Sequence, residues 1–193
     1  MIQFNDLLEA QSQKTDFRLT SSLQKNALFD TICLQFGSVR MPSRMLGVAQ
    51  NLADELLSNA FYNAPMDESG NPLYRDWDRR REVVLPDASA VEVDLAISKQ
   101  QWAIRVRDPF GSLTVKAVRD NIARAATKND NQVRMGSGGA GLGLFMVLST
   151  ASKMVIQIAA NQWTEIIATL EVRAAHRNFD QKLADLQIVE VLD

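Results

Sequence analysis

The sequence predicts an α+β fold, a two-layer α/β sandwich in which helices cover one face of a mixed, mostly antiparallel sheet. Three observations predict this class. Helical periodicity dominates the first sixty residues, two strand pairs with short turns follow, and an apolar helix lies between those pairs. Helices that precede and interleave with hairpins pack onto one side of an antiparallel sheet.

The first elements are short. Residues 2–11 predict a leading helix, and residues 16–19 predict an edge strand. Residues 21–24, Ser-Ser-Leu-Gln, match a capping box and therefore predict a helix start. We expect that helix to end before Gly37. Its predicted inner face holds Leu23, Ala27, Leu28 and Ile32.

A second helix follows the connection at 38–43. Its apolar residues recur at helical spacing and predict a buried stripe of Leu46, Ala49, Ala53, Leu57 and Ala60. An acid and an amide, Glu55 and Asn59, lie one turn apart on a neighbouring face.

Residues 64–82 separate this helix from the first strand pair. Prolines, a glycine and mixed charges exclude a continuous helix there. We expect Tyr74 and Trp77 to attach this insertion to the rest of the fold. The run Arg79-Arg80-Arg81 is more typical of a solvated surface than of a binding site.

Strand-like runs separated by short turns predict two hairpins, and the first of these runs alternates apolar and polar residues at its start. Residues 90–97 and 101–107 form the first, and 154–160 and 164–172 form the second, with its turn at Asn161-Gln162. Residues 113–126 predict a helix with Val118, Ile122 and Ala125 inward. Residues 178–188 predict a last amphipathic helix through Phe179, Leu183 and Leu186.

Length and composition limit the class of protein. A chain of 193 residues with 46% hydrophobic residues predicts one domain, 1–193, with an insertion at 64–82 and a C-terminal extension at 173–193. A net charge of −2 argues against nucleic-acid binding. The single cysteine, Cys33, excludes a disulfide framework, and its apolar neighbours predict a buried thiol. No apolar run reaches the roughly 18 residues of a membrane span, so we expect a cytoplasmic protein.

The most informative stretch is glycine-rich and runs from Met135 to Leu144, with five of the nine glycines. An apolar helix follows it directly, and such a helix start binds phosphate well. The lysine that a P-loop requires after its last glycine is absent, because Leu144 follows Gly143. A dinucleotide fingerprint requires a strand before the loop, and residues 128–134 are polar. The tight apolar helix that follows also argues against a flexible linker.

Three stretches in this order resemble the ATP-binding boxes of the GHKL superfamily, which includes gyrase, Hsp90-type chaperones, histidine kinases and MutL. The N box is Glu55 and Asn59, the first glycine box is Asp108 to Gly111, and the second is Gly136 to Leu144. The resemblance covers residues 45–172 and implies the Bergerat ATP-binding fold. Phe110 stands where the family usually has the first glycine of Asp-x-Gly-x-Gly.

The resemblance implies a role for each matching residue. Glu55 is the implied general base, Asn59 the implied Mg²⁺ ligand, and Asp108 the implied acceptor for the adenine amine. The implied ATP-binding residues also include Gly111, Gly136, Gly138, Gly139, Ala140, Gly141, Leu142 and Gly143. Residues 127–140 would form the lid. Asn63 has two open roles, a direct phosphate contact or a structural one.

Within the superfamily, the chain is most similar to the bacterial anti-sigma factor serine/threonine kinases. The only histidine, His176, lies on the wrong side of the domain for a phospho-acceptor. The resemblance implies phosphorylation of a STAS-domain antagonist (an anti-anti-sigma protein), and leaves open a sigma factor or other regulator as partner, and a homodimer. Two alternatives remain: a nucleotide-gated partner-switch protein without phosphotransfer, and a histidine-kinase catalytic domain acting in trans.

Overall fold

The computed structural model describes the backbone of residues 1–127, 140–173 and 179–192, and the side chains of these ranges except 124–127, 140–142 and 179–180. It is an α+β fold with an open six-stranded sheet in the order β1-β2-β3-β5-β4-β6. The strands are β1 (Gln13–Leu19), β2 (Val91–Ile97), β3 (Gln101–Asp108), β4 (Lys153–Ala159), β5 (Trp163–Glu171) and β6 (Gln187–Glu190). Neighbouring strands are antiparallel except β4 and β6, which are parallel.

Five α-helices and four short helical turns accompany these strands in the described ranges. The α-helices are α1 (Lys25–Val39), α2 (Ser43–Ser58), α3 (Val115–Thr127), α4 (Ala140–Thr150) and α5 (Phe179–Ala184). The turns are η1 (Phe4–Leu7), η2 (Ser22–Gln24), η3 (Asn59–Asn63) and η4 (Asp87–Ser89). Ser21 caps η2 through the predicted capping box, with Gln24 as its partner.

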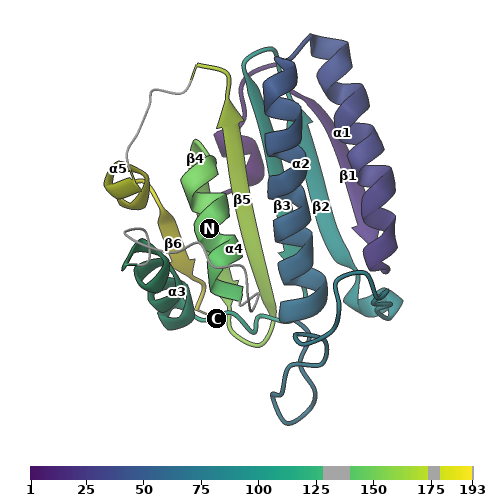
Figure 1. The fold of residues 1–193 in the computed structure, drawn as a ribbon, viewed down its shortest axis with the longest axis vertical. Coiled ribbons are helices and arrows are strands. Elements are labelled where there is room, and N and C mark those ends of the chain that lie inside the picture. Colours follow the sequence, from purple (N-terminus) through teal and green to yellow (C-terminus); the bar gives the residue numbers. More distant parts are fainter. Residues whose placement is uncertain (128–139, 174–178, 193) are drawn as a thin grey trace.

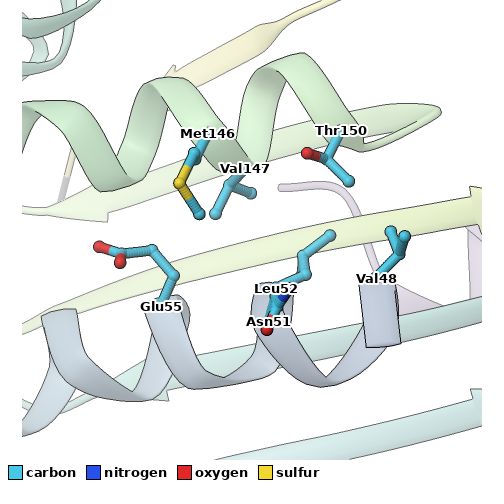
Figure 2. A pocket seen from close by; sticks show the side chains of 7 residues that line it. All are labelled: Val48, Asn51, Leu52, Glu55, Met146, Val147 and Thr150. Carbon is cyan, nitrogen blue, oxygen red and sulfur yellow. The ribbon is translucent and has the colours of Figure 1, made fainter. Parts of the chain in front are cut away.

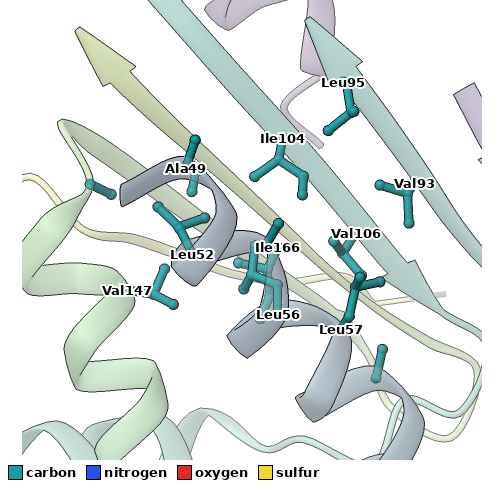
Figure 3. Packing of buried hydrophobic residues seen from close by; sticks show 14 of the residues in the cluster. Ala49, Leu52, Leu56, Leu57, Val93, Leu95, Ile104, Val106, Val147 and Ile166 are labelled. Atoms are coloured by element: carbon teal, nitrogen blue, oxygen red, sulfur yellow. The ribbon is translucent and has the colours of Figure 1, made fainter. Parts of the chain in front are cut away.

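The main core lies between the sheet and the helices α1, α2 and α4, which cover one of its faces (Figure 1). Figure 3 shows α2 side chains packing onto alternate residues of β2, β3 and β5, with Val147 of α4 beside them. Alternation along a strand sends every second side chain to this face, which is why the hairpins could be predicted from sequence. The opposite face carries a smaller cluster, where Phe4 of η1 packs on Ala96, Ala103, Val155 and Ile167.

Most predicted elements are present with small shifts of their ends. Both hairpins, the edge strand β1 and the helix α3 lie where the sequence placed them. Four of the five predicted stripe residues along α2 and η3 are buried, and Leu46 is half-buried. Tyr74 and Trp77 do pack against the core, and their rings meet edge to face with centroids 4.8 Å apart.

The prediction for α1 was partly wrong. The helix continues through Gly37 and ends at Val39, and the C-cap residue Arg40 takes the left-handed conformation with φ of 56°. Leu28 and Ile32 are buried as predicted, but Leu23 and Ala27 are exposed. The capping box begins the η2 turn rather than α1, so Leu23 lies before α1, whereas Ala27 lies on an exposed side of α1.

Cys33 is exposed, so the predicted buried thiol was wrong. The apolar neighbours of Cys33 misled the prediction because they face opposite ways. Ile32 is fully buried, whereas Leu34 on the outer side of α1 is 74% exposed. Cys33 Sγ accepts a hydrogen bond from the Gln50 side chain at 3.3 Å.

The C-terminal prediction was half right. The predicted helix at 178–188 is shorter, and the strand β6 follows it and pairs with β4. Ile188 pairs with Ile156, so a short apolar run that also fits a helix is used here to extend the sheet. His176 lies outside the described residues. Within the described ranges, none of the helices has both the length and the apolar character that a membrane crossing requires.

Candidate functional site

Three chain segments meet at one end of the molecule. The helix α2 runs into η3 there, β3 ends, and α4 begins, so that the ends of distant segments converge (Figure 1). The segment η3 also contacts β3, and α4 packs along α2. This convergence brings together parts of all three predicted boxes.

Glu55, Asn59 and Asn63 form a continuous row of polar side chains along α2 and η3. The Asn59 amide donates to Glu55 Oε1 at 3.3 Å, and the Asn63 amide donates to Asn59 Oδ1 at 2.7 Å. All three are only half-buried, so the row borders the core without being enclosed by it. Asn63 therefore has a structural partner on this row, and a further contact to a ligand remains a prediction.

The row continues because the helix widens at its end. The segment Asn59–Asn63 is a π-helical turn, in which the Ala64 N–H bonds to the Asn59 carbonyl at 2.9 Å. Such turns are rare and occur frequently at functional sites. Phe61 and Tyr62 of this turn are buried, which anchors the turn in the core.

The Glu55 carboxylate lies directly against the first turn of α4. A Cβ atom on Gly143 would stand 1.5 Å from Glu55 Oε1, so only glycine leaves room for the carboxylate. Figure 2 shows Glu55 extending from α2 toward α4. Burial raises the pKa of Glu55, the negative charge of Asp54 adds to this, and Arg79 and the Asn59 amide oppose it.

A pocket lies between α2 and α4 and includes Glu55 in its wall (Figure 2). Its remaining lining residues are Val48, Asn51, Leu52, Met146, Val147 and Thr150. The lining mixes apolar side chains with the polar Asn51 and Thr150, and among these seven residues Glu55 is the acidic one.

Asp108 is buried at the end of β3, 8% exposed, beside its strand partner Thr164. Its carboxylate accepts the Phe110 N–H at 3.0 Å and further main-chain N–H groups of Gly111 and Thr164. Desolvation nevertheless raises its pKa to about 7, against the opposing effect of these hydrogen bonds. Asp108 thus shapes its own turn, and a carboxylate has lone pairs left for one further donor.

Gly111 is required by its turn for two reasons. Its φ is +57°, a left-handed conformation that other residues adopt at a cost. A Cβ atom there would stand 2.3 Å from the Ala159 carbonyl oxygen and 2.5 Å from the Gln162 nitrogen. The turn after β3 is therefore packed tightly onto the turn between β4 and β5.

The glycine-rich stretch is described only in part. Gly136, Gly138 and Gly139 lie outside the described residues, as does the predicted lid except for Thr127 and Ala140 at its ends. Ala140, Gly141 and Leu142 form the first turn of α4, and Gly143 is buried against Glu55. The predicted phosphate loop thus leads into a helix start next to the polar row.

Arg79 and Tyr62 belong to this site and were missed by sequence reasoning. Arg79 Nη2 donates to Asn63 Oδ1 at 3.1 Å, and its guanidinium lies over the Tyr62 ring, 4.5 Å from the centroid. The Tyr62 hydroxyl reaches the main-chain oxygens of Arg79 and Arg81 at 3.0 and 2.7 Å. Neither contact has a sequence signature, since residues 16 or more positions apart meet across an irregular loop.

The three consecutive arginines Arg79, Arg80 and Arg81 thereby have different surroundings. Arg80 is exposed and paired with Asp78 at 2.6 Å, and Arg81 lies over the Trp77 ring at 3.4 Å. Only Arg79 reaches the polar row.

Within the described ranges, no group of three or more His, Cys, Asp or Glu side chains could hold a metal ion. Asn59 Oδ1 has a second lone pair beyond the one that accepts the Asn63 amide. A single amide oxygen fits Mg²⁺ that is held mainly by phosphate and water oxygens. No protein-family model matches this chain, and no curated protein is significantly similar to it.

Proposed function

We propose that this protein is an ATP-dependent serine/threonine protein kinase of the GHKL type, with the Bergerat fold, closest in kind to anti-sigma factor kinases. One observation carries the proposal. Glu55 lies against Gly143 in the first turn of α4, where a glycine-rich stretch leads into a helix start. A carboxylate at a phosphate-binding helix start is in position to take a proton during phosphoryl transfer.

Glu55 is the proposed general base. Burial raises its pKa, which makes the carboxylate a better proton acceptor than an exposed glutamate. It accepts the proton of a serine or threonine hydroxyl as that oxygen bonds to the γ-phosphorus, while the bond from this phosphorus to the bridging oxygen breaks and ADP leaves. Bound Mg-ATP would supply the phosphoryl group, and its Mg²⁺ would neutralise part of the phosphate charge.

Asn59 and Asp108 are the proposed binding residues. Asn59 would hold Mg²⁺ through Oδ1, and its hydrogen bond to Glu55 keeps the two side chains together. Asp108 accepts the adenine amine, and guanine has a carbonyl at that position, so the site would favour ATP over GTP. The buried position of Asp108 at the strand end supports this, because a ligand amine reaching it is shielded from water.

A STAS-domain antagonist is the proposed acceptor, with a sigma factor or another regulator as a second partner. This part rests on the resemblance of Glu55, Asn59, Asp108 and the glycine stretch to that kinase class. The polar row lies at the convergent end of the fold, where a partner loop could present its hydroxyl to Glu55.

The test separates catalysis from binding. ATP, GTP and ADP affinities are measured by calorimetry with and without Mg²⁺, and transfer of labelled γ-phosphate to a STAS-domain protein is followed in parallel. Glu55→Gln is expected to keep ATP affinity and to lower transfer by roughly 10²–10⁴-fold. Asn59→Ala is expected to weaken Mg-ATP binding itself, because it deletes the metal ligand. Asp30→Asn, an exposed acid on α1, is the control and is expected to change neither.

Each outcome has a defined meaning. Wild-type protein that binds no ATP refutes the nucleotide site. ATP binding without transfer by the wild type refutes the kinase and leaves the nucleotide-gated partner switch. Equal transfer by the Glu55→Gln variant and the wild type refutes Glu55 as the base.

A further inference from the structure

Arg79 is a cation without an acidic partner at close range. No Asp or Glu oxygen among the described residues lies within salt-bridge distance of its guanidinium, in contrast to Arg80 beside Asp78. Its Nη1 atom is buried and has no hydrogen-bond partner in the part of the chain that the structure describes. A buried charged donor that lacks a partner is costly, and a ligand is a common reason for keeping one.

The position of this guanidinium is fixed by three contacts. Nη2 donates to Asn63 Oδ1 at 3.1 Å, the guanidinium lies on the Tyr62 ring, and the Arg79 carbonyl accepts the Tyr62 hydroxyl at 3.0 Å. Both Asn63 and Tyr62 belong to η3, so the insertion is attached to the same turn that ends the polar row. The guanidinium is thus held in place before any ligand binds.

The charge of Arg79 acts on the site itself. It lowers the pKa of Glu55 against the larger effect of burial, so the two groups are close enough to interact electrostatically. From Arg79 the hydrogen bonds run through Asn63 and Asn59 to Glu55 without a break. One end of the row is therefore a cation with a free donor, and the other end is the proposed base.

We infer that Arg79 binds the terminal phosphate groups of the nucleotide, and that the 64–82 insertion exists in part to supply this cation. The inference rests on the proposed function and adds to it a phosphate ligand from outside the three boxes. A guanidinium matches phosphate oxygens with paired N–H donors and remains charged at all relevant pH values. Placed there, it also offsets negative charge that develops during phosphoryl transfer.

The test compares Arg79→Met and Arg79→Lys with the matched control Arg80→Met from the same arginine run. Affinities for ATP, AMP and inorganic tripolyphosphate are measured by calorimetry. Arg79→Met is expected to weaken ATP and tripolyphosphate binding by roughly 10- to 100-fold, the usual effect of losing a charge-assisted hydrogen bond. AMP affinity is expected to change little, because AMP lacks the terminal phosphates. Arg79→Lys is expected to recover part of the loss, and Arg80→Met to bind like the wild type.

A further readout keeps folding apart from the two hypotheses. Proteolytic cleavage within residues 64–82 reports whether the insertion keeps its place in each variant. If Arg79→Met loosens the insertion, Arg79→Lys, which preserves the charge, takes its place in the test. ATP binding by Arg79→Met that equals the wild type overturns the inference while the kinase proposal stands. The same holds if Arg79→Lys, with its insertion in place, binds ATP no better than Arg79→Met. Wild-type binding of tripolyphosphate but not ATP, lost in Arg79→Met, supports Arg79 as a phosphate ligand and refutes the nucleotide site. Wild-type protein that binds neither overturns both.

Discussion

The carboxylate of Glu55 takes the space that a side chain on Gly143 would need, with Oε1 1.5 Å from the position of a Cβ atom there. This contact joins α2 to the first turn of α4 and sets where the proposed base lies. The clashing atoms belong to the far end of a flexible side chain, so Glu55 can move away when the space is filled. Position 143 therefore controls the location of Glu55 without controlling the fold.

The first prediction follows from this contact. Gly143→Ala is expected to leave the free energy of unfolding unchanged or to raise it by up to about 1 kcal/mol, since alanine favours helices. Phosphotransfer is expected to fall by roughly 10²-fold, because the displaced carboxylate no longer reaches the hydroxyl. Gly47→Ala is the control, since Gly47 lies within α2 with nothing within 4 Å of its Cβ position. Activity retained in Gly143→Ala would show that the Glu55 position is unimportant.

The second prediction concerns the turn after β3. Gly111→Ala is expected to destabilise the fold by about 3 kcal/mol or more, because a strained φ and a clash with backbone atoms combine. Gly70→Ala isolates the strain alone, since Gly70 has φ of +78° but open space around its Cβ position. Chemical denaturation of both variants measures the difference. Equal losses at the two positions would mean that the turns do not pack as tightly as described.

A third prediction concerns pH. The pKa of Asp108 is about 7 in the folded protein and 3.8 in its ordinary state. Between these values the folded state holds a proton that the unfolded state has lost, so stability falls as pH rises through this window. The contribution approaches about 1.4 kcal/mol per pH unit and levels off above pH 7.

Urea denaturation from pH 4 to pH 8 tests the Asp108 titration. Asp108→Asn removes the titrating group and is expected to lose this part of the pH dependence, whatever its effect at a single pH. The same slope in the variant and the wild type would assign the pH dependence to other groups.

The fourth prediction concerns the attachment of the insertion. Tyr62→Phe keeps the ring under Arg79 but removes the hydroxyl that bonds to the main chain of residues 79 and 81. We expect a loss of about 1–3 kcal/mol in the free energy of unfolding, because main-chain acceptors lose a donor in a partly buried site. Faster proteolytic cleavage within residues 64–82 is also expected. Tyr74→Phe is the control, since it keeps the ring contact with Trp77; an equal loss there would argue against a specific role for the Tyr62 hydroxyl.

The fold was predictable for elements that pack one face on the core and leave the other face polar. The alternation at the start of β2 and the stripe of α2 both record which side contacts the core. The strands β4 and β5 are buried along nearly their whole length, and their hairpin was found from two apolar runs around a turn. The failures have a common cause, because local sequence does not fix which direction a residue faces when its neighbours are apolar on both sides. Cys33 lies between a fully buried isoleucine and an exposed leucine, and Ile188 lies in a run that fits a helix as well as the strand β6.

The site was predictable to the extent that its residues share one helix. Glu55, Asn59 and Asn63 are spaced four apart, and the structure places them in one hydrogen-bonded row. Arg79 was beyond sequence reasoning, since its contact with Asn63 depends on the path of an insertion without regular structure. Three charged side chains in a row look alike in a sequence, and only their distinct contacts with Asn63, Asp78 and Trp77 separate them.

The π-helical turn at 59–63 sets the orientation about the helix axis of the residues that follow it, so the number of residues in the turn matters. In an α-helix, residues four apart advance by about 40° around the axis, so a row of three drifts away from a straight line. The wider turn advances less per residue and so counteracts the drift at Asn63. Deletion of the single residue Ala60 would keep every side chain of the row. It would, however, rotate the residues that follow about the helix axis, including the insertion that carries Arg79. Substitution of Ala60 would thus be milder than its deletion.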